Sequence, residues 1–143
     1  MSQENILPYI PQRPPFVMID GIVSADDSLS KTTFTIREGH LFVSDGVFTE
    51  PGLVENMAQT AAAGTGYKAQ QDGKPAPVGF IGALKNLKVN MLPKVGDTLT
   101  TEVVFKMQVM NAHIVESVVK VNEEEIASCE LKIFLQQEAP SAP

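Results

Sequence analysis

Two polar side chains stand inside an otherwise apolar segment, and their types and spacing suit proton-transfer chemistry. Glu55 and Gln59 lie four residues apart in EPGLVENMAQTAAAGTGY, so on a helix they share one face. Burial disfavours a carboxylate, whereas a helix N-terminus favours it. That opposition produces a carboxyl group poised for proton transfer. The structural alternative is a hydrated Glu55 that only complements the helix dipole, and the residues alone leave both interpretations open.

The chain holds two histidines, His40 and His113. Imidazole exchanges protons near neutral pH, so His40, in the segment before Glu55, is either a candidate base or an exposed turn residue. We interpret His113, beside a predicted turn, as an exposed turn residue. One cysteine excludes an internal disulfide, and the Cys, His, Asp and Glu residues show no metal-ligand spacing. We therefore expect no metal and no cofactor.

The segment that carries Glu55 is predicted to be a buried helix over residues 50–67. Pro51 stands just inside its start, apolar residues recur at helical spacing, and no Lys or Arg occurs before Lys68. Such a helix is roughly 25 Å long.

The rest of the chain favours strands. Residues 16–22 and 31–36 are predicted as short strands, and residues 37–48 as a loop with turns at 38–39 and 45–46. After residue 77, three alternating segments predict a meander of long antiparallel strands, 99–110, 115–121 and 127–135. Short strands, one buried helix and then long strands indicate an α+β fold in which a curved sheet wraps around the helix.

Length and composition limit the function classes. The 143 residues, 43% of them hydrophobic, suffice for one domain with a core. We expect a frayed segment at 1–6, a single domain at 7–135 and a disordered tail at 136–143. A net charge of -6 argues against nucleic acid. No apolar run approaches the roughly 20 residues of a membrane span, and the first residues do not form a signal peptide, so we expect a cytoplasmic protein.

Three segments together resemble a known family. They are IPQRPPFVMIDGI, EPGLVENMAQ and FIGALKNLKVNMLPKVGDTL, and in this order they are similar to the hotdog-fold 3-hydroxyacyl-[acyl carrier protein] dehydratases. The aryl-polyene-type branch is the more similar one, because its "DGxxPAWxGxExMAQ" motif aligns without gaps to residues 45–59.

The resemblance implies an enzyme that dehydrates 3-hydroxyacyl thioesters, on acyl carrier protein or coenzyme A, to trans-2-enoyl thioesters. It implies a homodimer, or a trimer of dimers, in which each site takes residues from two chains. Glu55 would be the acid and His40 the base. The expected substrate-binding residues are Gly52, Gln59, Phe48, Phe80 and Gly82. Apart from the resemblance, three lysines gather in ALKNLKVNMLPK, and they are named here the docking lysines: Lys85, Lys88 and Lys94. They form either a solvated strand face or a dock that attracts an acidic carrier protein or a phosphopantetheine.

The sequence also departs from the family pattern. In "GHFPxxPxxPG" the histidine is followed by prolines that are absent here, and His40 lies one residue farther from Glu55 than that motif places it. The histidine of the family's N-terminal "LPHRxPF" motif is Gln12 here. Two alternatives therefore stay open: a hotdog acyl thioesterase that needs no histidine, and a non-catalytic subunit that binds acyl groups or acyl carrier protein.

Overall fold

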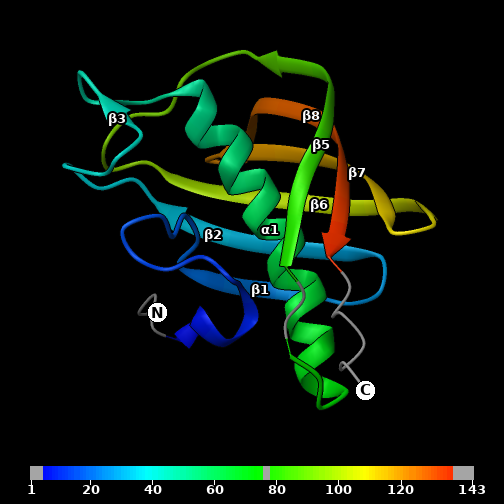
Figure 1. Cartoon of the computed structure of the whole chain (residues 1–143). Coiled ribbons are helices and arrows are strands. Elements are labelled where there is room, and N and C mark those ends of the chain that lie inside the picture. Colours follow the sequence, from blue (N-terminus) through cyan, green and yellow to red (C-terminus); the bar gives the residue numbers. More distant parts are fainter. Residues whose placement is uncertain (1–4, 76–77, 137–143) are drawn as a thin grey trace.

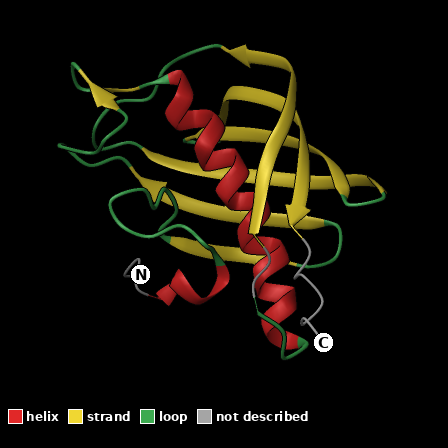
Figure 2. Ribbon diagram, viewed as in Figure 1, coloured by secondary structure: helices red, strands yellow, loops and turns green. Residues whose placement is uncertain are grey.

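A single long helix lies in the concave face of a curved sheet (Figure 1). The computed structural model describes residues 5–75 and 78–136, without the side chains of residues 78, 135 and 136. The helix, α1 (Glu50–Gln71), packs against the sheet and contacts each of its strands, and loops connect the elements at both ends of the sheet (Figure 2). This architecture confirms the expected α+β fold with one buried central helix.

The main sheet is antiparallel throughout its six strands, in the order β1-β2-β6-β7-β8-β5. Consecutive pairing of β6, β7 and β8 confirms the predicted meander, and β5 forms one edge. A small separate hairpin, β3 with β4, lies within the segment predicted as a loop. The strands are β1 (Gly21–Ala25), β2 (Leu29–Thr35), β3 (Val43–Ser44), β4 (Val47–Phe48), β5 (Val78–Val89), β6 (Thr98–Val109), β7 (Ala112–Val121) and β8 (Glu124–Gln136).

The helix begins where the sequence predicts and ends one turn later. Pro51 stands in its first turn, and the N–H of Leu53 donates to the carbonyl of Thr49. The helix ends at Gln71 rather than at residue 67, and Gly73 follows with φ +70°, a conformation that glycine adopts without strain. Its last turn is polar and exposed, so apolar periodicity did not reveal it.

The first predicted strand, residues 16–22, is wrong over most of its length. The strand observed in this region, β1, begins at Gly21, and residues 16–20 run as an irregular segment. Its buried backbone at Met18 hydrogen-bonds to helix side chains instead of to a strand. The apolar run Val17–Ile19 therefore reflects burial rather than strand pairing.

The alternation in β6 does not hold to its end. Leu99, Thr101 and Val103 are fully buried as predicted, but Met107 and Val109 are 59% and 54% exposed. The pairing of β6 with β7 shifts in register between residues 105 and 107, and the hairpin extends beyond the helix (Figure 1). No core covers this end of the strand.

Two apolar clusters hold the layers together. The larger one packs Leu53 and Met57 of α1 against the inner face of the sheet. The smaller one packs Ile6 and Ile10 against Ala63. Ile6 is 1% exposed although it falls in the segment expected to fray; residues 1–4 and 137–143 of the two expected frayed segments lie outside the described residues.

Candidate active site

The helix places Glu55 in its second turn, where its side chain is half-buried. Its Oε1 accepts a hydrogen bond of 3.1 Å from Nε2 of Gln59. This contact is the one expected from residues four apart on a helix. A side-chain amide that donates to the carboxyl fixes its rotamer, as a proton-transfer group requires.

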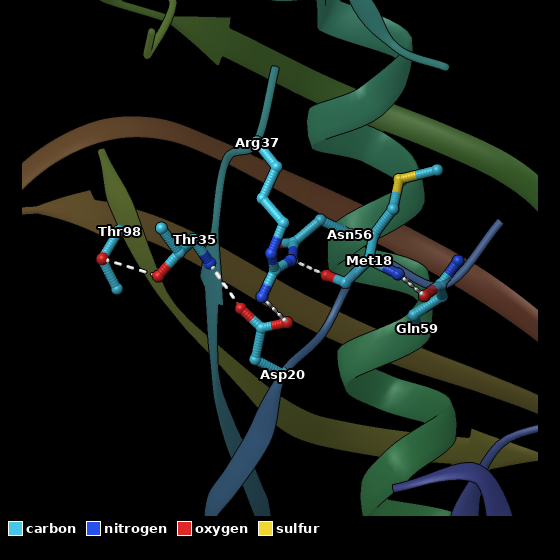
Figure 3. Close-up of polar contacts among 7 residues, drawn as sticks. All are labelled: Met18, Asp20, Thr35, Arg37, Asn56, Gln59 and Thr98. Atoms are coloured by element: carbon cyan, nitrogen blue, oxygen red, sulfur yellow. Dashed lines mark hydrogen bonds and ion pairs between the residues drawn. The ribbon is translucent and has the colours of Figure 1, made fainter. Parts of the chain in front are cut away.

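Gln59 also connects the helix to the irregular segment that precedes β1. The side chain is fully buried, and its Oε1 accepts a hydrogen bond of 2.6 Å from the N–H of Met18. Its Nε2 donates to the carbonyl of Phe16 at 2.8 Å. Figure 3 shows Gln59 with its neighbour Asn56 reaching Met18 from the helix. The amide of Gln59, which orients Glu55, is therefore fixed by hydrogen bonds to the backbone of Phe16 and Met18.

Asn56 completes this connection on the same turn. Its Nδ2 donates to the carbonyl of Met18 at 2.7 Å, and its Oδ1 accepts from Oγ1 of Thr101 at 2.6 Å. Both polar groups of the Met18 backbone are thus paired with helix side chains. Sequence reasoning missed Asn56, because nothing in the local pattern separates a buried polar connector from a surface asparagine.

A cavity of about 300 Å³ runs along the helix beside Glu55. Its walls come from α1, from the four strands β5, β6, β7 and β8, and from the segment before residue 16. Small helix residues and strand apolar groups make most of the lining, and four polar side chains interrupt it, a composition typical of small-molecule sites. The lining residues are Gln12, Glu55, Ala58, Ala61, Ala62, Thr65, Gly79, Phe80, Ile81, Phe105, His113 and Ile133.

A second, more polar cavity of about 400 Å³ adjoins the first. Thr65, Phe105 and His113 line both, so the two are neighbours. The second cavity adds charged groups from the β1–β2 turn and from the end of α1, including an ion pair of Lys68 with Asp27. Glu55 and Thr65 are ten residues apart, about 15 Å along the helix axis, so Glu55 stands well away from the polar cavity.

His40 lies outside the cavity that Glu55 lines within this chain. Its ring stands among the rings of Phe34, Phe42 and Phe48, with centroids 5.5, 6.2 and 5.8 Å away. Nδ1 accepts a hydrogen bond of 3.2 Å from the N–H of Phe42. Burial lowers the pKa of His40 below the usual value of 6.5, partly opposed by the backbone of Val17. The ring is thus neutral near pH 7.

His113, interpreted from the sequence as an exposed turn residue, instead lines the cavity. It lies near the start of β7, half-buried, with its ring 6.1 Å from that of Phe105. Burial lowers the pKa of His113 below 6.5. The structure therefore corrects that interpretation: the imidazole faces the same cavity as Glu55.

The glycines predicted to approach substrate are explained in part by packing. A Cβ at Gly82 would lie 2.1 Å from the ring of Phe134, and a Cβ at Gly52 would lie 2.7 Å from the ring of Phe48. Aromatic side chains thus occupy the space next to both residues. Phe48 is fully buried in the core, whereas Phe80 is 60% exposed and lines the cavity.

The docking lysines are exposed, two on the edge strand β5 and one in the loop that follows it. Lys85 faces Glu130 across the pairing of β5 with β8. None of the docking lysines forms an ion pair with another described residue, so their charges are available to a partner.

Within residues 5–75 and 78–136, no three His, Cys, Asp or Glu side chains are placed to hold a metal ion. No helix in this part of the chain is long and apolar enough to cross a membrane.

Comparisons with known proteins show the family of this chain. The model of the ApeP-like family, described as ApeP dehydratase, matches residues 4–142. The 3-hydroxyacyl-[acyl-carrier-protein] dehydratase FabZ of Brucella ovis is 34% identical over 141 residues, which cover 92% of this chain and 87% of the relative.

Solved structures agree in fold. The dehydratase heterocomplex ApeI:P from Xenorhabdus doucetiae superposes with a TM-score of 0.86 at 16% identity, covering 93% of this chain and 91% of that one. A hypothetical thioesterase of Streptococcus pneumoniae TIGR4 with coenzyme A has a TM-score of 0.64 at 12% identity, covering 84% and 88%. At such identities the likeness concerns the fold alone. With the family match over nearly its whole length, the chain belongs to the ApeP-like dehydratases.

Proposed function

We propose that this chain dehydrates 3-hydroxyacyl thioesters carried on acyl carrier protein, giving trans-2-enoyl thioesters. The observation that carries the proposal is the oriented carboxyl of Glu55 on the wall of a largely apolar cavity. Membership of a dehydratase family and the name of the FabZ relative supply the reaction and the carrier.

The reaction needs two proton transfers. A base removes the α-proton of the acyl group, and an acid protonates the β-hydroxyl so that it leaves as water. We assign the acid to Glu55, held by the donor group of Gln59. Backbone N–H groups in the first turn of α1, around Gly52, would stabilise negative charge on the thioester oxygen, because such groups have no partner within a helix.

We assign the base to His40 of a second subunit. Within its own chain His40 lies among phenylalanine rings and not on the cavity wall, so a site built from two chains would be needed to bring it to Glu55. The similar structure from Xenorhabdus doucetiae is described as a heterocomplex, and a homodimer or trimer of dimers would serve the same purpose here. The competing base is His113, which lines the cavity of its own chain.

The test is mass spectrometry of 3-hydroxyacyl-acyl carrier proteins after incubation with the protein. We expect loss of one water from the acyl chain, abolished by Glu55→Gln and unaffected by the exposed control Glu124→Gln. His40→Ala and His113→Ala are assayed in parallel, and the variant that loses turnover identifies the base.

Other products would overturn the proposal. Release of the free acid would show thioesterase activity instead, and the chain is similar in fold to a hypothetical thioesterase. If the protein binds the acyl-acyl carrier protein but leaves its acyl chain unchanged, the protein has a non-catalytic role.

A further inference from the structure

We propose that Gln12 binds the β-hydroxyl group of the substrate through its side-chain carbonyl oxygen, beside Glu55. The proposal rests on the proposed function and adds a residue to its site. Its basis is that Gln12 and Glu55, 43 positions apart in the sequence, line the same cavity.

The carbonyl oxygen of Gln12 is an acceptor in need of a donor. Oε1 is buried, and no donor among the described residues reaches it. Buried acceptors in proteins are almost always paired, and a hydroxyl group supplies one O–H donor. A 3-hydroxyacyl chain with its β-carbon at Glu55 brings such a hydroxyl group into this cavity.

The segment around Gln12 is held in place before any ligand binds. Nη1 of Arg13 donates to the carbonyls of Leu7, Ile10 and Gln12 at 3.1, 2.8 and 2.8 Å. Ile10 is 1% exposed and packs in the smaller cluster. The carboxamide is thus attached to a rigid backbone, which reduces the cost of ordering it around a substrate.

This contact fits the chemistry of the elimination. When the β-hydroxyl donates its hydrogen to Gln12, a lone pair of its oxygen stays available to the Glu55 proton. That proton then transfers to the hydroxyl oxygen, the Cβ–O bond breaks and water leaves. The α-proton passes to the base, and the electrons of the Cα–H bond form the double bond. Gln12 binds and orients the leaving group without exchanging a proton itself.

The experiment compares two ligands that differ only in the β-hydroxyl group. Both are pantetheine conjugates in which an amide replaces the thioester, because an amide acidifies the α-proton less and so slows elimination. One carries 3-hydroxyoctanoyl and the other octanoyl. Their dissociation constants are measured by calorimetry for the full-length wild type, for Gln12→Met, which keeps the approximate shape without the amide, and for the exposed control Gln71→Met.

We expect the wild type and Gln71→Met to prefer the hydroxylated ligand, and Gln12→Met to lose that preference by on the order of tenfold. Octanoyl binding should change little, and thermal unfolding should show that Gln12→Met is folded. An unchanged preference in a folded Gln12→Met would overturn the proposal. Equal weakening of both ligands would overturn it too, because it would assign Gln12 to the pantetheine amides.

The dehydration assay separates this proposal from the one on which it rests. If the wild type dehydrates 3-hydroxyacyl-acyl carrier protein while Gln12→Met keeps the ligand preference, only the role of Gln12 fails. If the wild type dehydrates nothing and does not distinguish the two ligands, both proposals fail.

Discussion

Replacing Gln59 with methionine tests whether one side chain both stabilises the fold and orients the acid. Methionine keeps the approximate volume in a fully buried position but offers no amide. Three hydrogen bonds disappear, to the Met18 N–H, the Phe16 carbonyl and the Glu55 carboxyl. Met18 is 0% exposed, so its N–H keeps no partner and no water, whereas Phe16 is 55% exposed and its carbonyl is the less costly loss.

The expected destabilisation follows from these three contacts. The unpaired buried N–H of Met18 costs about 1–3 kcal/mol, and the two partly buried contacts, to Phe16 and Glu55, contribute about 0.5 kcal/mol each. We therefore expect the free energy of unfolding of Gln59→Met to fall by about 2–4 kcal/mol. The matched control Gln70→Met removes one exposed hydrogen bond of 3.3 Å to the Pro8 carbonyl and should cost less than about 0.5 kcal/mol.

The assay is urea unfolding at pH 7 of both variants and the wild type, with kcat and KM for dehydration measured on the folded proteins. We expect kcat to fall more than KM rises, because Glu55 keeps its place but loses the donor that orients it. A Gln59→Met variant as stable as Gln70→Met, or one with wild-type kcat, would refute the reasoning.

Three further results follow from the same structure. In Gly66→Ala the added Cβ would lie 1.8 Å from the carbonyl oxygen of Tyr9, so the N-terminal segment around Tyr9 must move. The free energy of unfolding should fall by about 3 kcal/mol or more. A variant whose urea midpoint stays near that of the wild type would contradict this close approach. Burial lowers the pKa of His40 and His113 below 6.5. As the pH falls below 6.5, these imidazoles therefore take up protons in the unfolded chain before they do so in the folded one, so the free energy of unfolding should be unaffected by them above pH 6.5 and should decline below it. Thermal unfolding and kcat/KM from about pH 5 to about pH 8 check this, and activity that rises toward low pH would disagree. Changing the docking lysines to glutamate should raise KM for the carrier-protein substrate by on the order of tenfold at low salt, with KM for a pantetheine-bound substrate as the control; equal changes in both would argue against docking.

The position of the helix and the meander followed from local patterns. Pro51 and the small apolar residues after it indicated the start of α1, and the alternation in β7 and β8 matched the buried faces. These features depend on neighbours within one turn or one strand, so periodicity reports them directly. The contact of Glu55 with Gln59 was accessible for the same reason.

Local patterns failed where partners are distant in sequence. Residues 16–20 have the composition of a strand, but amides about 40 positions away take up the Met18 backbone bonds. The β6 alternation continues past the point where the helix stops covering the sheet, so Met107 and Val109 are exposed.

The sequence by itself determined the fold class, the helix and the carboxyl on it, because each depends on residue spacing along one element. The tertiary structure decided which other groups share the cavity with that carboxyl. Gln12 and His113 come from segments far from Glu55 in sequence and face the same cavity, whereas His40, closer in sequence, does not line it. The reason is physical: a cavity forms where separate elements pack, and the position of each wall depends on long-range contacts that no single segment encodes.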